Sequence, residues 1–318
     1  MNVRERFRAV MDFQPVDRLP MTESYWWWDK TQNRWYDEGL PRHLKTHGEI
    51  AQYFGLDLHR IFWPAPQAQI KGVEEYDSLF RPAMDNPQLD RAEMEQYARE
   101  QQEGKAFLWC QLDGFFWFPR RIMGIERHLL AFYDEPELMH KMNRDILAFN
   151  LRTLERMGEF FRPDLFSIAE DMSYNHGPML SQAMFDEFIA PYYRQLVPAM
   201  KKLGSTVVVD SDGDITDLIP WLDAVGVEGL TPLERMAGTD INRIRRDWPR
   251  WRMLGAFDKT TMHRGEAVMR KEFERILPVM KSGGYLPSCD HQTPPEVSLN
   301  DYRLYVKLLG EYCRTAAK

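Results

Sequence analysis

The stretch TVVVDSDGDITDLIPWLDAVGVEGLTPLE, residues 206–234, decides the fold class. It holds two short apolar runs, 206–212 and 226–234, which each end in a carboxylate and are separated by an amphipathic segment. This order is typical of a strand, a helix and a second strand in a sheet of βα units. Three more runs of this kind follow residue 160, namely DLFSIAE (164–170), RMLGAFD (252–258) and GYLPSCD (284–290). The second half of the chain is therefore predicted to contain five βα repeats.

Capping residues support these repeats. Ser181 precedes the amphipathic segment 182–203, and Gly204 follows it, as an N-cap and a left-handed C-cap do. Ser298 and Asp301 have the spacing of a capping box for a helix that starts at Leu299. The sequence thus predicts a helix at both places.

The first half of the chain is less regular. Strand-like runs occupy 16–23, 58–64 and 105–114, and helical patterns occupy roughly 4–11, 46–54, 90–102 and 121–157. The segments 24–45 and 64–89 are rich in aromatic, Pro, Asn and Asp residues. Loops of that length in a compact domain tend to be functional.

Three strands plus five give eight, so we predict an α/β fold of the (β/α)8 TIM barrel type. A single domain over residues 1–318 would carry an N-terminal helix and long loops after strands 1 and 2. An open doubly wound sheet is the alternative, but that fold usually has a Gly-rich turn after its first strand. The corresponding segment here, TESYWWWDK (22–30), is not such a turn.

The composition limits the partners of the protein. Of 318 residues, 44% are hydrophobic and 28% are charged, which is typical of a globular protein with a sizeable core. The net charge of −7 argues against nucleic acid as a partner. No segment reaches the run of about 18 apolar residues that a membrane span needs, and we expect a cytoplasmic protein. The three cysteines lack the spacing of a disulfide framework.

The carboxyl ends of the predicted strands carry most of the candidate chemistry. In a barrel these ends converge on one mouth, although they are far apart in the sequence. Several carboxylates in one cavity repel each other, so a metal, a cationic substrate or shared protons are expected there. The residues at these ends are Glu23, Glu170, Asp171, Asp210, Asp212, Glu234, Asp258, Cys289, Asp290 and His291.

A metal is one way to balance that charge. Asp210 and Asp212 share one face if both lie in extended backbone, and Cys289 adds a thiol from the last strand. Zinc takes thiolate, imidazole and carboxylate ligands, so these three residues are the predicted metal ligands, with Glu170 or His291 as substitutes. A buried, inert Cys289 is the alternative.

The remaining candidates are weighed between structure and chemistry. His291 exchanges a proton near neutral pH and is a candidate acid or base, as are Glu170, Glu234 and Asp258, although a carboxylate after a strand also often caps the next helix. Asp214 is better explained as such a cap. His176 is the one other histidine that we consider for the site.

Three adjacent tryptophans, Trp26, Trp27 and Trp28, follow Glu23 and the first predicted strand. A hydrophobic lid or an oligomer interface is the ordinary explanation for them. All three cannot face one core, however, so at least one is expected to be exposed or to face a ligand. A flat aromatic or a cationic methylated substrate would suit them, with Glu23 beside it.

The motifs resemble those of the uroporphyrinogen decarboxylase superfamily. RERFRAVMDFQPVDRLP (4–20) resembles its opening, and GGYLPSCDHQTPPEVSLNDYRLYVKLL (283–309) resembles its closing strand and helix. Between them, FSIAEDMSYNHGPMLS (166–181), residues 210–234 and LGAFDK (254–259) follow the family's order. The resemblance implies a (β/α)8 barrel and one of two chemistries: cofactor-free decarboxylation, or zinc-dependent methyl transfer involving a corrinoid on a partner protein.

The residues divide between these two branches. His291 matches the histidine that decarboxylases carry before the TPP segment, but their N-terminal RQAGRY-like arginines are replaced here by TESYWWWDK. The methyltransferase branch carries zinc ligands at the positions of Asp210, Asp212 and Cys289, and only the cysteine is retained. A substrate with eight carboxylates would be repelled by an acidic mouth.

The sequence therefore predicts a methyltransferase that moves a methyl group from an aryl methyl ether or a methylamine-like donor to a corrinoid protein, assisted by zinc. Glu170 or Glu234 would position the donor or protonate the departing group. A cofactor-free decarboxylase or lyase that uses His291 and carboxylates is the alternative, and a barrel that only binds a ligand is a third reading. A homodimer is expected from fold analogy alone.

Overall fold

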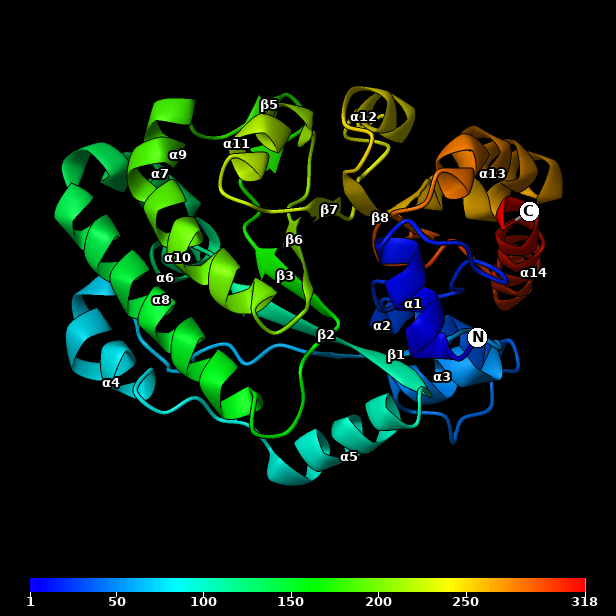
Figure 1. Ribbon diagram of the computed structural model, residues 1–318, viewed down its shortest axis with the longest axis horizontal. Coiled ribbons are helices and arrows are strands. Elements are labelled where there is room, and N and C mark those ends of the chain that lie inside the picture. The colour runs from blue at the N-terminus through cyan, green and yellow to red at the C-terminus, as the bar shows by residue number, and fades with distance from the viewer. Residues whose placement is uncertain (318) are drawn as a thin grey trace.

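The structure, a computed structural model, describes residues 1–317. Its centre is a curled parallel sheet of seven strands in the order β1-β2-β3-β6-β7-β8-β9 (Figure 1). Seven of the eight predicted strands are thereby confirmed, together with the α/β class. Their bounds are β1 (Leu58–Phe62), β2 (Ala106–Asp113), β3 (Leu165–Ala169), β6 (Thr206–Asp210), β7 (Gly229–Thr231), β8 (Arg252–Phe257) and β9 (Tyr285–Cys289).

The predicted first strand, 16–23, is wrong. The segment bends at Asp17 and Arg18, and it forms no ladder with β1 or β9. Pro20 lies in its middle and has no N–H to give to a ladder, and the N–H of Leu19 donates instead to Cys313 O (3.2 Å). Within residues 1–317 the sheet is therefore a half-barrel, and no eighth strand closes it.

The segment 16–23 still passes between the two edges of the half-barrel. The N–H of Asp57, just before β1, donates to Met21 O (2.7 Å). The N–H of Cys289, at the end of β9, donates to the carboxylate of Glu23 (2.9 Å). Isolated hydrogen bonds, and not a strand ladder, thus connect both edges of the sheet to the segment that was expected to pair with them.

The predicted helix caps are confirmed. Ser298 and Asp301 form the predicted capping box at the start of α14 (Leu299–Ala316). Asn2 and Glu5 form a further capping box, which was not predicted, at the start of α1 (Val3–Met11). Ser181 accepts the N–H of Met184, as predicted, but the helix that it caps is divided into α9 (Gln182–Phe188) and α10 (Ala190–Lys201). The division lies just before Pro191, which cannot donate a helical hydrogen bond.

The other helical predictions are confirmed with one refinement. The long pattern 121–157 is three helices, because Gly124 takes a positive φ of 77° and Pro136 begins the third. The loop 24–45 contains α2, and the loop 64–89 contains only short helical turns up to α4. The bounds are α2 (Asp29–Asp37), α3 (His47–Tyr53), α4 (Arg81–Ala83), α5 (Arg91–Gln102), α6 (Trp117–Met123), α7 (Ile125–Asp134), α8 (Pro136–Met157), α11 (Ile219–Asp223), α12 (Ile241–Asp247) and α13 (Glu266–Lys281).

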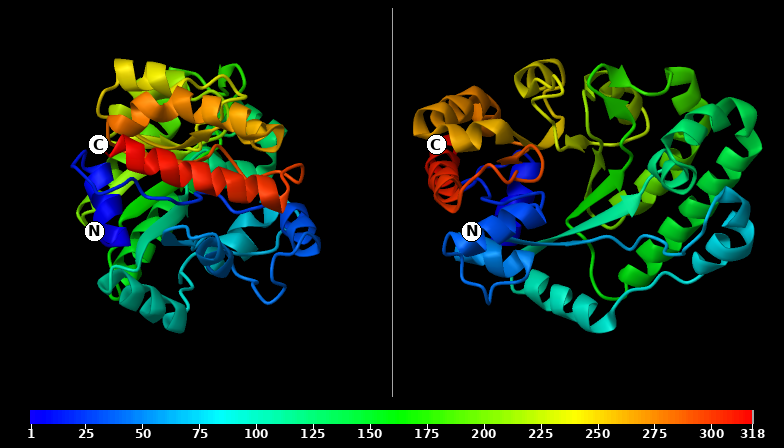
Figure 2. Two further views of the ribbon diagram at one scale, coloured as in Figure 1. Left: turned by 90° about the vertical axis from the view of Figure 1, so that its right-hand side faces the viewer. Right: turned by 180° about the vertical axis from the view of Figure 1, so that it is seen from behind.

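Helices cover the outer side of the curled sheet. In Figures 1 and 2, α8 and α10 lie on one side of the molecule, and α1, α13 and α14 lie on the other. Phe7 of α1 stacks on Phe107 of β2 with ring centroids 4.0 Å apart, so the N-terminal helix is part of the core. The hairpin of β4 (Ser173–Tyr174) and β5 (Gly177–Pro178) follows β3.

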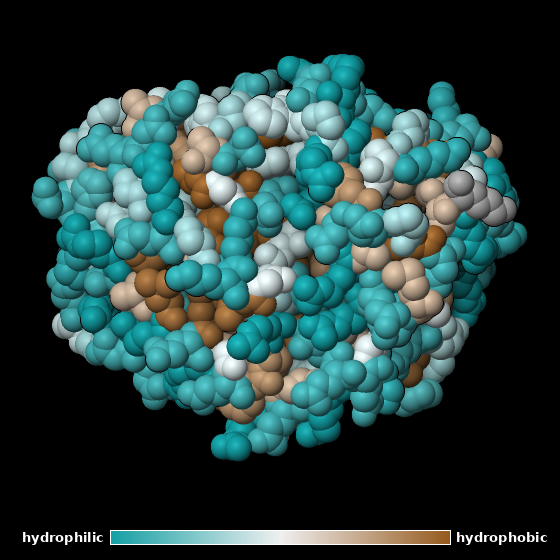
Figure 3. Space-filling view, viewed as in Figure 1, coloured by the Kyte–Doolittle hydropathy of each residue, from teal (hydrophilic) through white to brown (hydrophobic). Residues whose placement is uncertain are grey.

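Hydrophilic side chains cover most of the face seen in Figure 3, and apolar side chains gather where α8 and α10 lie. Among the helices that the structure describes, none is long and apolar enough to cross a bilayer.

Candidate active site

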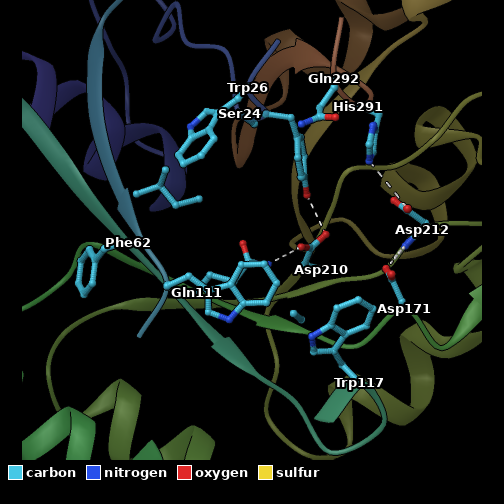
Figure 4. A pocket seen from close by; sticks show the side chains of 14 residues that line it. Ser24, Trp26, Phe62, Gln111, Trp117, Asp171, Asp210, Asp212, His291 and Gln292 are labelled. Atoms are coloured by element: carbon cyan, nitrogen blue, oxygen red, sulfur yellow. Dashed lines mark hydrogen bonds and ion pairs between the residues drawn. The ribbon is translucent and has the colours of Figure 1, made fainter. Parts of the chain in front are cut away.

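A cavity of about 300 Å³ opens at the carboxyl ends of β1, β2, β3 and β6 (Figure 4). Aromatic side chains from the N-terminal loop, the end of β1 and the start of α6 form most of its wall, and carboxylates and a histidine form the rest. The lining residues are Ser24, Tyr25, Trp26, Ile61, Phe62, Trp63, Gln111, Trp117, Ala169, Asp171, Asp210, Asp212, His291 and Gln292. Among the described residues that line this cavity, there is no Lys or Arg.

Asp210, the last residue of β6, is held by two donors. The hydroxyl of Tyr25 donates to one carboxyl oxygen (2.8 Å) and the amide of Gln111 donates to the other (2.9 Å). A carboxylate has about four acceptor positions, so two remain for a ligand. Burial, followed by the nearby charges of Asp171 and Asp212, raises the pKa of Asp210 to about 8, although both hydrogen bonds act to lower it.

Tyr25 connects Asp210 to the rest of the cavity. Its hydroxyl lies 3.1 Å from the hydroxyl of Thr231, and its ring stacks on His291 with centroids 5.4 Å apart. Burial raises the pKa of Tyr25 well above its usual range, so the hydroxyl keeps its proton at neutral pH. Tyr25 is therefore a fixed donor or relay rather than a base.

Asp212 and His291 face each other across the cavity. Nε2 of His291 lies 3.9 Å from Oδ2 of Asp212, which is too far for a hydrogen bond. Burial, followed by the charges of Asp171 and Glu234, raises the pKa of Asp212 to about 7. Burial, followed by the charge of Lys259, lowers the pKa of His291, so the imidazole is neutral at physiological pH.

Glu234 and Asp290 lie beside the cavity but do not line it. Nζ of Lys259 is 3.0 Å from Glu234 and 3.5 Å from Asp290. Asp290 also accepts the N–H groups of Arg235 (3.0 Å) and Lys259 (3.2 Å), which joins the loops that follow β7 and β8. Glu234 was a predicted catalytic residue, and the structure places it in this charge-paired cluster.

Glu170 does not reach the cavity. Its side chain is fully buried, and its carboxylate accepts the N–H groups of Phe115 (2.9 Å), Phe116 (2.7 Å) and Trp117 (3.1 Å) and the hydroxyl of Tyr193 (2.8 Å). All of its roughly four acceptor positions are therefore in use. The geometry gives Glu170 an internal role in place of the predicted contact with a donor.

The three predicted zinc ligands do not come together. Asp210 and Asp212 line the cavity, but Cys289 is fully buried outside it, with its sulfur 3.9 Å from that of Met262. Burial raises the pKa of the Cys289 thiol well above its usual range, which disfavours the thiolate that zinc requires. Within residues 1–317, no group of three His, Cys, Asp or Glu side chains is placed to hold a metal. The described residues thus do not fit the predicted zinc site.

Glu23 and Asp258 also lie outside the cavity lining. The carboxylate of buried Glu23 accepts the N–H of Cys289 and the hydroxyl of Tyr302 (3.0 Å), and burial raises its pKa to about 8. Asp258 caps the 3-10 turn Lys259–Arg264 by accepting the N–H of Thr260 (2.9 Å). The structural role that we considered for such carboxylates is the one observed for Asp258, and likewise for Asp214, which accepts the N–H of Thr216 (3.1 Å).

The aromatic segment divides between two cavities. Trp26 is 49% exposed and lines the active-site cavity, and it also lines an adjoining cavity of about 1010 Å³ together with Trp27 and Trp28. Trp27 is buried in the core and Trp28 is 44% exposed, so the three tryptophans do not share one face, as expected. His176 is exposed beside Tyr174, away from both cavities.

Three of the lining residues that sequence reasoning missed bear directly on the chemistry of the cavity. Tyr25 stood beside the tryptophans that drew attention, Gln111 is a polar residue within the otherwise apolar β2, and Trp117 follows β2 in the segment GFFWF. A polar side chain inside a buried strand was a usable signal for Gln111. Nothing in the sequence distinguished Tyr25 or Trp117 from other aromatic residues.

Comparison of the sequence with known protein families identifies the family of the chain. Residues 67–312 match the family described as Uroporphyrinogen decarboxylase (URO-D). The chain belongs to this family. The resemblance inferred from the motifs is thereby confirmed. In this URO-D family member, the cavity is lined by Tyr25, Asp210, Asp212 and His291, among others.

Comparison with solved structures finds one that shares the fold over nearly the whole chain. A methyltransferase from Methanosarcina mazei superposes with a TM-score of 0.63 at 14% sequence identity, covering 98% of this chain and 99% of that chain. A xylose isomerase domain protein from Planctomyces limnophilus reaches a TM-score of 0.45 at 12% identity, covering 86% of this chain and 93% of that one. No curated protein sequence matches the chain.

Proposed function

We propose that this URO-D family member is a methyltransferase that removes a methyl group from a small aryl methyl ether, with a corrinoid on a partner protein as the methyl acceptor. One observation carries the proposal. A small aromatic cavity holds an acid, Asp210, whose pKa is raised to about 8, and its described lining has no cationic side chain. The full-length likeness to a methyltransferase fold supports this branch of the family.

The cavity favours a small, neutral donor over a porphyrinogen. Its volume of about 300 Å³ is at the lower end of the roughly 300–1,000 Å³ that small-molecule sites occupy. A tetrapyrrole with many carboxylates needs more space and cationic partners. With the pKa of Asp210 at about 8 and that of Asp212 at about 7, protons cancel part of the negative charge of the cavity at neutral pH, which leaves less attraction for a methylated ammonium than three ionised carboxylates would give.

The residues supply orientation and a proton. The aromatic wall, including Trp117 and half-exposed Trp63, holds the ring of the donor. When the bond between the methyl carbon and the ether oxygen breaks, its electron pair stays on the oxygen, and Asp210 gives that oxygen its proton. The resulting carboxylate is stabilised by the hydrogen bonds from Tyr25 and Gln111.

The methyl acceptor would be met at the open side of the cavity. A corrinoid supplies a nucleophilic cobalt centre that takes the methyl group, and the protein supplies binding, orientation and electrostatics. The cavity is too small to enclose a corrin ring, so the acceptor would stay at the mouth, where Trp26 and Trp63 are half exposed. We propose no step through zinc, because the predicted ligands do not converge.

The test is an anaerobic assay with methoxybenzene as donor and free cob(I)alamin as acceptor. Wild-type protein is expected to form methylcob(III)alamin, followed by absorbance, together with phenol, followed by mass spectrometry. Asp210→Asn is expected to lower kcat about 10²- to 10⁴-fold, the range for loss of a general acid, while Asp186→Asn, an exposed control on α9, keeps full activity. Equal activity of Asp210→Asn and wild type would remove Asp210 from the mechanism.

The same protein also tests the lyase alternative, which the opposed pair of His291 and Asp212 favours. Release of carbon dioxide from an aryl carboxylic acid that is lost in His291→Gln, without methyl transfer in the first assay, would establish the alternative in place of our proposal.

A further inference from the structure

Glu170 connects the end of β3 to the start of α6. Its carboxylate collects the three consecutive N–H groups of residues 115–117, and Asp171, the next residue, binds the same helix through its backbone. The guanidinium of Arg120 donates to the carbonyl oxygen of Asp171 (2.7 Å) and lies 5.6 Å from the ring of Trp117. Two neighbouring residues thus fix the first turn of α6 against the sheet.

The parts that this connection holds in place are strained. Asp171 has a positive φ of 46°, a conformation that is unfavourable for residues other than glycine. The indole N–H of Trp117 is buried without a hydrogen-bond partner among the described residues, which is unfavourable for a polar group removed from water. Both residues line the active-site cavity. Strain of this kind persists only where the surroundings over-determine it, and it gathers at functional sites.

We propose that Glu170 is a positioning residue: it fixes Trp117 and Asp171 in the cavity wall and thereby sets the affinity for the aromatic ring of the donor. The Glu170 carboxyl group lies so close to the backbone at Gly114 that a Cβ on that residue would collide with it, so the position requires glycine. One carboxyl oxygen of the fixed Asp171 accepts the N–H of Asp212 (3.3 Å), so the anchor extends along the cavity wall to Asp212.

If Glu170 only stabilises the fold, its replacement leaves the surroundings of Trp117 in the folded protein unchanged. If Glu170 positions Trp117, its replacement changes those surroundings. The test uses full-length protein labelled with 5-fluorotryptophan, in which the fluorine resonance that disappears in Trp117→Phe identifies Trp117. In folded Glu170→Gln, whose amide cannot accept all four donors, we expect this resonance to shift or broaden. Resonances of the distant Trp248 and Trp251 are expected to stay, and Glu187→Gln, an exposed control on α9, is expected to change none.

The kinetic part of the inference rests on the proposed methyl transfer. Glu170→Gln is expected to raise KM for methoxybenzene about tenfold while kcat changes less than about twofold, the pattern of a lost binding contribution. If wild-type protein transfers no methyl group, the proposed function fails, but the fluorine spectra still decide the role of Glu170. An unchanged Trp117 resonance in folded Glu170→Gln overturns the positioning role.

A second variant covers the case in which Glu170→Gln does not fold. Tyr193→Phe keeps the carboxylate and removes one of its four donors. It is expected to shift the Trp117 resonance in the same direction by a smaller amount, and an unchanged resonance in this variant counts equally against the proposal.

Discussion

Glu170 and Asp210 stand at the ends of neighbouring strands, and the N–H of Glu170 donates to the carbonyl oxygen of Asp210 (2.9 Å). In the sequence both are carboxylates that follow an apolar run. In the structure Glu170 accepts four hydrogen bonds from its own protein, and Asp210 accepts two and faces a cavity. Both residues stand at a strand end, so that position does not distinguish them. They differ in the acceptor positions that the protein leaves free: Asp210 keeps positions for a ligand, and Glu170 keeps none.

The two carboxyl groups share one property, a pKa raised mainly by burial. The values are about 7 for Glu170 and about 8 for Asp210, and Glu23, Asp212 and Asp290 are raised to about 8, 7 and 6. At these carboxyl groups the folded state therefore binds more protons than the unfolded state between about pH 4 and 8. The stability that this gives is fully present below the unfolded pKa and is lost as the pH rises through the folded values. Burial lowers the pKa of His47, His59 and His128, so these act in the opposite direction below about pH 6.5.

The largest expected effect is thus a fall in the free energy of unfolding from about pH 7 to pH 9, where histidines are neutral in both states, measured by urea denaturation at a series of pH values. Each group that stays protonated only in the folded state contributes a slope of about 1.4 kcal/mol per pH unit. Asp210→Asn is expected to remove one such contribution and make the curve flatter. A stability that rises across this range would contradict the assignment of these carboxyl groups as buried acids.

A smaller effect isolates the anchor. Gly114→Ala is expected to destabilise the protein by about 1–3 kcal/mol, because the added methyl group collides with the carboxyl group of Glu170. In a Glu170→Ala background the same change should cost much less, since the colliding group is gone. The double-mutant cycle, measured by denaturant unfolding, gives the coupling between the two residues directly. Equal costs in both backgrounds would mean that Gly114 is required for another reason.

The availability of hydrogen-bonding groups also explains which strands could be predicted and which could not. Seven strands were visible because each is a short apolar run between punctuated helices, and burial of such runs is what the sheet requires. The run 16–23 looked alike, but Pro20 and the hydrogen bond from Leu19 to Cys313 exclude a ladder there. The hydrophobic pattern predicts that a segment is buried. It does not predict whether the backbone N–H groups of that segment are available for a strand ladder.

For the site, the sequence could predict the convergence of strand ends but not the direction of each side chain. Asp210, Asp212 and His291 do meet, although they span 82 positions. Cys289 and His291 are two residues apart, yet the strand ends at Cys289, so alternation does not extend to His291, and one lies in the core while the other lines the cavity. Tyr25 lies in an irregular segment, for which no periodicity predicts a direction.

The smallest expected effect tests whether Asp210 is tuned as well as placed. Tyr25 donates a hydrogen bond that favours the charged form of Asp210, so Tyr25→Phe should raise the pKa of that carboxyl group further. A hydrogen bond worth about 0.5–1.5 kcal/mol corresponds to a shift of about 0.5 to 1 pH unit.

Because the proposed acid works when protonated, the alkaline fall of kcat should move to higher pH by that amount in Tyr25→Phe, measured as a pH profile of methyl transfer. Tyr133→Phe is the matched control, since Tyr133 is 75% exposed on α7 and remote from the cavity lining. A fall that stays in place, or moves to lower pH, would show that the group that titrates in the profile is not Asp210. Glu170, which makes no contact with Tyr25 in the described hydrogen bonds, should keep its anchoring of Trp117 in this variant.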